Sequence, residues 1–362
     1  MFEIRNLAAK AGTFSLSDIS LTVAGGSCHV IVGATGSGKT LLLESILGLR
    51  KLSRGSTLVD GRDITNQPLE KRNISYVPQD LALFPHLTVE DNIRYGLRMR
   101  GIKDPEHARM VERLMESVGI AELSHRSIGN LSGGERQRVA LVRAIAAGNR
   151  HLLLDEPFSA LHQGLRRELW FLLKELQQTW NLTVLMVTHD MEEAFFLGDR
   201  VSVMIDGTIR QTGAAREVYE RPADMAVARF FGIRNIFPGR VRAQSGSALL
   251  VTCDSLGTEL TIPLGAALHP AGEPGAPCSV GIRPENVMVL KADRPSRTQD
   301  NLLTGILTDI LIKGASHTLL FRPAETAAVV ELEVPDYALK KMQLQEGDCI
   351  SIFFKGESLF LF

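Results

Sequence analysis

Short apolar runs alternate with longer amphipathic stretches from the start of the chain to about residue 232. Such runs are typical of strands buried on both faces of a parallel sheet, and the amphipathic stretches are typical of the helices between them. The predicted elements are strands at 28–32, 151–154 and 182–187, a helix at 40–49, and a hairpin of 201–205 and 208–211 around Asp206-Gly207. The pattern predicts that residues 1–232 form an α/β domain around a largely parallel sheet.

Within this region, residues 88–140 are charged and helical in pattern, and we expect a helical subdomain there. Apolar side chains recur at helical spacing, namely Leu97, Met99, Met110, Leu114, Met115 and Val118. A buried helix core is the favoured interpretation of these positions. A docking surface for a partner protein is the alternative, because methionines also serve adaptable binding surfaces.

The pattern changes near residue 238, where Gly, Pro, Val and Thr become frequent and the apolar runs become short. Apolar and polar positions then alternate, as in strands with one solvated face. Strands are predicted at 248–252, 259–262, 279–282, 318–321 and 329–334. Residues 233–362 are therefore predicted to form a small all-β domain, as one barrel or a pair of them.

Length, charge and composition narrow the range of functions that the chain could have. The 362 residues suggest two domains, and the formal net charge of -1 argues against broad nucleic-acid binding. Four cysteines, none in a CxxC pair, are expected to be free thiols in a reducing compartment. No signal pattern is seen, and no apolar run approaches the ~20 residues of a membrane-spanning helix. We expect a soluble chain that docks onto another subunit if it serves a membrane.

A phosphate-binding pattern follows the strand at 28–32. It fits G-x-x-x-x-G-K-[ST] and consists of Gly33-Ala34-Thr35-Gly36-Ser37-Gly38-Lys39-Thr40. Its glycines let backbone N–H groups face one anion, and the next helix adds its positive dipole end. We expect Lys39 to reach the β- and γ-phosphates and Thr40 to place its hydroxyl on Mg²⁺. The strand before the motif and the helix after it disfavour a chance glycine-rich turn.

Two acids, Asp155 and Glu156, end the apolar strand at 151–154. Beside a phosphate loop, a carboxylate at a strand end can hold Mg²⁺ directly or through water, and we assign this to Asp155. Glu156 is then the candidate general base that polarises the attacking water. Merely solvated acids are the alternative, which the nearby phosphate loop disfavours.

The segment Ser132-Gly133-Gly134-Glu135 predicts a helix start, because Ser132 and Glu135 stand at capping-box spacing. Two glycines in the first turn leave backbone N–H groups open to an anion. Taken alone, the motif supports two interpretations equally well: an anion-binding helix start, and a capped helix with no further function.

At this point the sequence resembles the ATPase subunits of ABC transporters. The family signature, LSGGE or LSGGQ, matches Leu131–Glu135. Gln79 matches the Q-loop, the two acids match the Walker B motif with its catalytic acid, and His189 matches the switch histidine. Five motifs follow one another in the family's order within residues 1–232.

The resemblance implies a homodimer whose two copies face each other head to tail and share two ATP sites. Each ATP, with Mg²⁺, would lie between one P-loop and the other copy's Ser132–Glu135. The implied catalytic residues are Glu156, His189 as sensor of the γ-phosphate, and Gln79 as link to the membrane domain. The implied metal ligands are Thr40, Gln79 and Asp155.

The resemblance also implies partners and a location. An importer ATPase is a peripheral subunit at the cytoplasmic face of the inner membrane, bound to two permease subunits and served by a periplasmic or extracellular solute-binding protein; no nucleic acid is expected. A soluble ABC protein outside transport is the alternative, but such proteins usually lack a β extension. A cassette that binds ATP without hydrolysing it is disfavoured by the intact Glu156 and His189.

Two positions depart from the family pattern. His162 follows Ser-Ala-Leu where the family usually has Asp. The favoured interpretation is a tolerated substitution, and the alternative is an altered rate of ATP turnover. Ala11 or Gly12 falls where an aromatic commonly stacks on adenine. Phe14 is either its substitute or, as slightly favoured, a core residue of a strand.

The C-terminal domain resembles the TOBE and MOP-like β domains of importer ATPases, through 281–286 and 301–305. Segments of the first domain resemble molybdate and tungstate importers; ferric iron, polyamine and sulfate systems are the alternatives. Residues 298–301 match the register of an oxyanion-binding pattern, but Asp300 replaces its Arg. Lys313 could still offer a cation to an oxyanion regulator.

Overall fold

The computed structural model describes residues 1–264, 273–290 and 301–362. These residues form two compact units, Met1–Glu220 and Arg221–Phe362. Asp300 and the two residues before it lie outside the described residues, whereas Asn301 is described. Within the described ranges, no helix has the length and apolar character needed to cross a bilayer.

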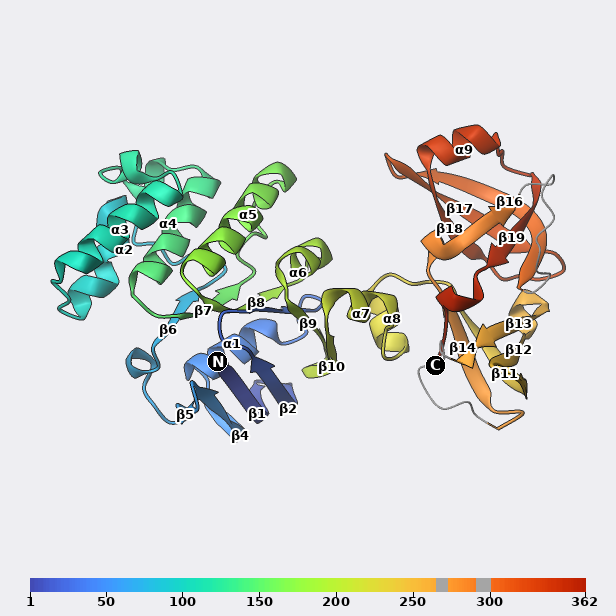
Figure 1. The fold of residues 1–362 in the computed structure, drawn as a ribbon, viewed down its shortest axis with the longest axis horizontal. Helices are drawn as coiled ribbons and strands as arrows, with labels where there is room; N and C mark the ends of the chain where they lie inside the picture. The colour runs from blue at the N-terminus through green and yellow to red at the C-terminus, as the bar shows by residue number, and fades with distance from the viewer. Residues whose placement is uncertain (265–272, 291–300) are drawn as a thin grey trace. The chain divides into compact units, whose positions relative to one another are not determined.

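Two sheets form the framework of the first unit (Figure 1). The six-stranded sheet has the order β10-β9-β3-β8-β7-β6 and is parallel except for the β9–β10 hairpin, which confirms the predicted α/β fold. Its strands are β3 (Cys28–Val32), β6 (Ile74–Val77), β7 (His151–Asp155), β8 (Thr183–Thr188), β9 (Arg200–Ile205) and β10 (Thr208–Gly213). The antiparallel sheet β2-β1-β4-β5 comprises β1 (Phe2–Ala11), β2 (Phe14–Val23), β4 (Leu52–Val59) and β5 (Arg62–Asp63).

Helix α1 (Lys39–Leu47) packs against both sheets, and most of its residues are buried. Its leucines and Ile46 join one core cluster with residues of β1, β2, β3, β7 and β8. Burying each such side chain contributes about 1.5–3 kcal/mol. Arg72 holds the far end of the helix, where its Nη1 donates to the carbonyl of Ile46 at 2.5 Å. The P-loop is thus tied to a rigid framework.

The remaining helices of this unit are α2 (Val89–Met99), α3 (Pro105–Ser117), α4 (Gly133–Ala146), α5 (Gln163–Thr179), α6 (Met191–Leu197) and α7 (Ala215–Glu220). Leu97, Leu114, Met115 and Val118 are at most 5% exposed, as predicted for a helix core. Met99 is 68% exposed, so the core prediction is wrong for this residue. It ends α2, where the chain turns away through the left-handed Gly101 (φ 65°).

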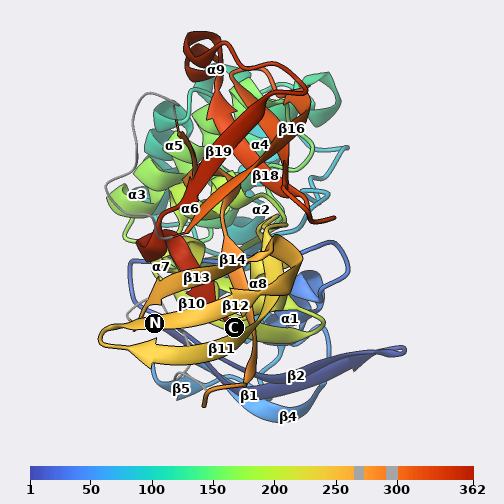
Figure 2. The ribbon, with the colours of Figure 1, turned by 90° about the vertical axis from the view of Figure 1, so that its right-hand side faces the viewer.

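The second unit contains the short helix α8 (Met225–Phe230), two five-stranded antiparallel sheets and the helix α9 (Asp336–Met342). Figure 2 looks onto β11, β12 and β13 of the first of these sheets. The sheets have the orders β13-β12-β11-β14-β20 and β15-β19-β16-β17-β18. Their inward residues form one core, which confirms the predicted all-β fold. The strands are β11 (Ile236–Ser245), β12 (Ala248–Cys253), β13 (Thr258–Pro263), β14 (Pro277–Ile282), β15 (Val287–Leu290), β16 (Leu302–Ile312), β17 (Ser316–Pro323), β18 (Val330–Pro335), β19 (Cys349–Phe354) and β20 (Leu359–Leu361).

Two buried asparagines complete strand edges in this unit. The side chain of Asn235 donates to the carbonyl of Glu331 at 2.7 Å and accepts from its N–H at 2.8 Å. Asn301 makes the same pair of bonds to Thr261, at 2.9 and 2.6 Å. Each side-chain amide thereby replaces a peptide group of a neighbouring strand. The hydrogen-bonding groups of Asn301 are engaged in the fold.

Candidate functional site

The carboxyl ends of four adjacent parallel strands meet at one edge of the six-stranded sheet. There β3 leads into the P-loop, β6 into Gln79, β7 into Glu156 and β8 into His189. This edge is where open α/β sheets bind ligands. A cleft of about 590 Å³ lies here, lined by Thr35, Gly36, Gly38, Lys39, Thr40, Leu41, Gln79, Glu156, Ser159, Ala160 and His189. The structure thus brings together P-loop residues, Gln79, Glu156 and His189.

The P-loop conformation depends on its glycines. Gly36 and Gly38 have φ of 85° and 103°, a region that other residues rarely adopt. A Cβ on Gly33 would lie 2.4 Å from the carbonyl oxygen of Met204, which is too close. Ser37 is turned inward and is 6% exposed. These three glycines therefore allow the backbone to bend tightly in a form that can surround an anion.

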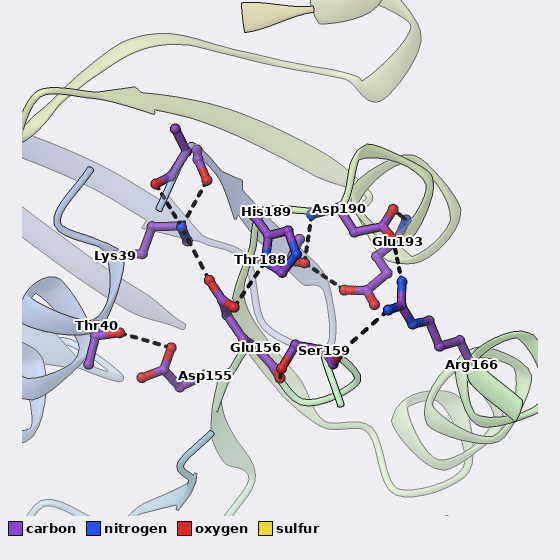
Figure 3. A network of polar contacts seen from close by, with 12 residues as sticks. Lys39, Thr40, Asp155, Glu156, Ser159, Arg166, Thr188, His189, Asp190 and Glu193 are labelled. Atoms are coloured by element: carbon purple, nitrogen blue, oxygen red, sulfur yellow. Dashed lines mark hydrogen bonds and ion pairs between the residues drawn. The ribbon is translucent and has the colours of Figure 1, made fainter. Parts of the chain in front are cut away.

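The ammonium of Lys39 is surrounded by oxygen atoms. Its Nζ donates to the carbonyls of Gly33 and Ala34 at 2.8 and 3.1 Å, and it lies 3.3 Å from Oε1 of Glu156 (Figure 3). The Lys39 side chain is 4% exposed. A buried ammonium needs such partners, and phosphate oxygens at the cleft could take their place.

Glu156 connects two sides of the cleft. While Oε1 faces Lys39, Oε2 lies 2.9 Å from Nδ1 of His189. The backbone of Glu156 has φ of 44°, a left-handed conformation that costs about 1–3 kcal/mol in a non-glycine residue. The neighbouring strand β8 holds this backbone, since the N–H of Glu156 donates to the carbonyl of Val187 at 2.9 Å. The carboxylate is therefore held at a fixed place.

Asp155 lies beneath the cleft and is 2% exposed. Its oxygens accept hydrogen bonds from the hydroxyls of Thr40, at 3.2 Å, and Tyr76, at 3.3 Å. Burial raises the pKa of the Asp155 carboxyl above its usual range. Burial, together with the Asp155 charge, also raises the pKa of the Tyr76 phenol, which therefore stays protonated. Asp155 is thus a buried carboxyl whose described hydrogen-bond donors are two neutral hydroxyls.

The signature segment begins α4 as predicted. The N–H of Ser132 donates to Oε2 of Glu135 at 2.6 Å, and the N–H of Glu135 donates to Oγ of Ser132 at 3.3 Å, which forms a capping box. The hydrogen bond with Ser132 lowers the pKa of Glu135. A Cβ on Gly134 would lie 2.8 Å from Leu165, so glycine allows α4 to approach α5. Ser132, Gly133, Gly134 and Glu135 do not line the cleft described above.

The loop after Gln79 is held by the same helix that begins at the signature. Arg143 of α4 donates Nη2 to the carbonyl of Leu81 and Nη1 to that of Ala82, both at 2.6 Å. Leu81 and Ala82 are both left-handed, with φ of 63° and 43°. The Arg143 guanidinium also lies over the ring of Phe84, 5.5 Å from its centre.

The two departures from the family pattern have clear places. His162 is the exposed N-cap residue of α5, and its side chain makes no capping hydrogen bond. Phe14 packs against the core cluster around α1. A Cβ on Gly38 would lie 2.7 Å from Phe14, so this ring supports the P-loop from behind and is not among the cleft residues.

Several residues of the site were not predicted. Tyr76 reaches Asp155 because β6 and β7 pair in parallel, and the alternating burial of β6 was the available signal. Ser159 and Ala160 line the cleft because the chain after Glu156 turns back. Leu41 follows from helical spacing after Lys39. Arg166, which contacts this turn, had no signal in the sequence.

The sequence of this chain is similar to those of known proteins. The profile of the ABC transporter family matches residues 16–159. The molybdate/tungstate import ATP-binding protein WtpC of Pyrococcus horikoshii is 36% identical over 362 residues, which cover 100% of both chains. This chain belongs to the ATP-binding subunits of ABC transporters.

Other ABC import subunits are similar. The spermidine/putrescine import protein PotA of Oleidesulfovibrio alaskensis is 35% identical over 93% of this chain and 90% of the relative. The Fe(3+) ions import protein FbpC of Streptomyces coelicolor is 41% identical over 79% of this chain and 78% of the relative.

A solved structure is also similar. The crystal structure of MJ1267 in its ADP conformation, an ATP-binding cassette of an ABC transporter, has a TM-score of 0.56 and 24% identity, covering 64% of this chain and 98% of that one. That likeness supports the fold. The family binds ATP, and this ABC subunit is an importer-type ATPase.

Proposed function

We propose that this chain hydrolyses ATP in the P-loop cleft with Glu156 as general base. The observation that carries the proposal is the double contact of Glu156, with Lys39 on one side and His189 on the other. Lys39 is placed to meet the β- and γ-phosphates, so Glu156 lies beside the position of an attacking water. His189 can donate a hydrogen bond to the γ-phosphate, and Gln79 lines the same cleft.

The residues beside the P-loop fit Mg²⁺. Thr40 and Asp155 supply hard oxygen atoms, and the hydrogen bonds described for the buried Asp155 carboxylate come from two neutral hydroxyls. We infer that Thr40 and Asp155, with the side-chain oxygen of Gln79, hold the ion that accompanies ATP. Bound there, it neutralises charge on the phosphates. Few protein ligands suffice, because Mg²⁺ keeps waters and phosphate oxygens.

We further propose that two copies complete each site. Ser132–Glu135 presents the N-terminal end of α4 but is not part of this chain's own cleft. In a head-to-tail homodimer the segment would face the γ-phosphate bound by the other copy. Residues 1–232 would then carry catalysis, and residues 233–362 would stabilise the dimer and carry regulation.

The importer relatives imply a membrane permease and a solute-binding protein as partners. We propose that two permease subunits hold this chain peripherally at the cytoplasmic face of the membrane. The loop after Gln79 supports this, since it joins the cleft to α2 and is braced by Arg143.

ATP hydrolysis by the purified chain with Mg²⁺ tests the proposal. Glu156→Gln keeps the side-chain volume and removes the base. We expect it to bind ATP like the unmodified chain and to hydrolyse it about 100-fold or more slowly. An unchanged hydrolysis rate in Glu156→Gln would overturn the assignment of the base.

We propose molybdate or tungstate as the transported solute. The support is the likeness over the full length of WtpC, the molybdate/tungstate import protein, including the second unit. Cells lacking this chain should lose uptake of labelled molybdate and tungstate, and Glu156→Gln should not restore it. Loss of spermidine, ferric iron or sulfate uptake in their place would overturn the choice of solute.

Regulation by an oxyanion would concern the second unit. Lys313 lies in the turn between β16 and β17, and its N–H donates to the carbonyl of Ser316 at 2.9 Å. In the sequence, Asp300 stands where the oxyanion-binding pattern has an Arg. A carboxylate at this position would repel an anion. We therefore expect no tight binding when molybdate is titrated calorimetrically into the full chain; a stoichiometric heat would contradict this.

A further inference from the structure

Arg166 joins the two loops that carry Glu156 and His189. Its Nε donates to the carbonyl of Leu161 at 2.8 Å and its Nη2 to that of Ser159 at 3.3 Å, both in the turn after β7. Its Nη1 lies 3.0 Å from Oδ2 of Asp190, which follows His189 after β8. Figure 3 shows the guanidinium between the two loops. One planar group therefore fixes three acceptors on two separate loops.

Asp190 divides its two oxygens between different tasks. Oδ1 accepts from the N–H groups of Glu192 and Glu193 and thereby caps α6. Oδ2 faces Arg166. We call the contacts of Arg166 with Asp190, Ser159 and Leu161 the bridge. A substitution that keeps Oδ1 and replaces Oδ2 would therefore remove the contact of Asp190 with Arg166 and leave the cap of α6 intact.

The residue before His189 is fixed as well. The hydroxyl of Thr188 donates to Oε2 of Glu193 at 2.6 Å and accepts from the N–H of Asp190 at 3.0 Å. Glu193 is 1% exposed. His189 is thus flanked by two anchored residues, while its own side chain is 45% exposed and free to meet Glu156.

The bridge also reaches Glu156. Oγ of Ser159 donates to the carbonyl of Glu156 at 3.0 Å, so the carbonyl held by Arg166 belongs to a residue that braces Glu156. Arg166 stands near the N-terminal end of α5, where a cation is unfavourable to the helix dipole. Its position is therefore not explained by the stability of α5 alone, whereas Asp190 and the two carbonyls account for it.

We propose that Arg166 is a positioning residue that keeps His189 in contact with Glu156 by tying Asp190 to the turn between Ser159 and Leu161. The proposal rests on the proposed roles of Glu156 and His189 in ATP hydrolysis. Without the bridge, the two loops would move independently and the distance between the imidazole and the carboxylate would vary. Nucleotide binding, which depends on the P-loop, would be retained.

The test uses the full chain with ATP and Mg²⁺. Arg166→Ala removes all three bonds, and Asp190→Asn keeps the Oδ1 acceptor for α6 while it replaces the acceptor for Arg166 by an amide donor. Both should lower kcat about 10- to 100-fold, as small misplacements at a site do, with the ATP dissociation constant unchanged. The double variant should be no slower than the slower single variant. Arg166→Lys, which can reach only part of these acceptors, should recover part of kcat.

Controls separate the possible failures. Arg167→Ala removes the same charge from an exposed neighbour and should hydrolyse ATP normally. In a His189→Ala background, Arg166→Ala should lower kcat by a much smaller factor than in the unmodified chain, whereas a merely structural role would give the same factor in both backgrounds. Normal kcat in both Arg166→Ala and Asp190→Asn, with Glu156→Gln inactive, would overturn the positioning role alone. Hydrolysis by Glu156→Gln at the normal rate would instead overturn the proposed function. If Arg166→Ala does not fold, Asp190→Asn decides.

Discussion

Nδ1 of His189 lies 2.9 Å from Oε2 of Glu156, and this contact joins the loops after β7 and β8. If His189 senses the γ-phosphate from this position, His189→Ala should lower kcat about 100-fold and leave ATP affinity unchanged. Single-turnover hydrolysis and equilibrium binding of ATP measure the two effects. A large loss of affinity with normal kcat would show that His189 serves binding and not chemistry.

Asp155 should carry the dependence on Mg²⁺. Removing its charge with Asp155→Asn should raise the Mg²⁺ concentration for half-maximal hydrolysis about 10-fold or more. Titration of ATPase activity with MgCl₂ checks this, with Glu192→Gln, an exposed acid, as control. An unchanged Mg²⁺ requirement would exclude Asp155 as a ligand.

The same variant should stabilise the metal-free chain. Burial raises the pKa of Asp155, so its stabilising contribution is present below the unfolded pKa and is lost as pH rises through the folded pKa. At pH 7 the ionised carboxylate is therefore unfavourable to folding without metal. Thermal unfolding in EDTA at pH 7 should give a higher Tm for Asp155→Asn than for the unmodified chain; a lower Tm would contradict this.

His29 should make the chain sensitive to acid. It is 1% exposed in β3, its Nε2 lies 2.8 Å from Oγ of Ser202, and burial lowers its pKa to about 4. Because the unfolded state binds the proton first, this contribution to stability is present above pH ~6.5 and is lost as pH falls toward 4. The free energy of unfolding should fall by about 2 kcal/mol from this group between pH 7 and pH 5.

Urea unfolding of His29→Gln at both pH values checks this account. The variant retains a side chain that can contact Ser202, and its fall in stability between pH 7 and pH 5 should be smaller by about 2 kcal/mol. An identical fall in both chains would show that other groups cause the acid sensitivity.

Sequence patterns predicted the features that depend on neighbouring residues. Asp206-Gly207 forms the predicted turn, with φ of 47° and 75°, because turn chemistry is local. The capping box of Ser132 and Glu135 is local in the same sense. Arg166 and Asp190 are 24 positions apart in the sequence, one before β8 and the other after it. Their contact therefore arises only when the sheet has folded. Met99 had the spacing of a core residue, but its helix ends there and leaves it exposed.

His162→Asp should stabilise the first unit, because His162 occupies the N-cap of α5 without a capping hydrogen bond. An aspartate there can accept from an N–H of the first turn, which contributes about 1 kcal/mol. Urea unfolding measures the gain. We favour a tolerated substitution, so the ATPase rate should stay unchanged; a changed rate with the same gain in stability would show that this position controls turnover.

The most direct test of the central claim mixes two inactive variants. Lys39→Ala disables the P-loop, and Ser132→Arg disables the signature. In a homodimer of either variant, both shared sites contain a disabled half and neither can hydrolyse ATP. In a mixed dimer, the P-loop of the Ser132→Arg copy faces the signature of the Lys39→Ala copy, which restores one site. If ATP lies between two copies, a refolded equimolar mixture with verified mixed dimers should regain about a quarter of the normal ATPase rate. No recovery in such a mixture would contradict the shared site.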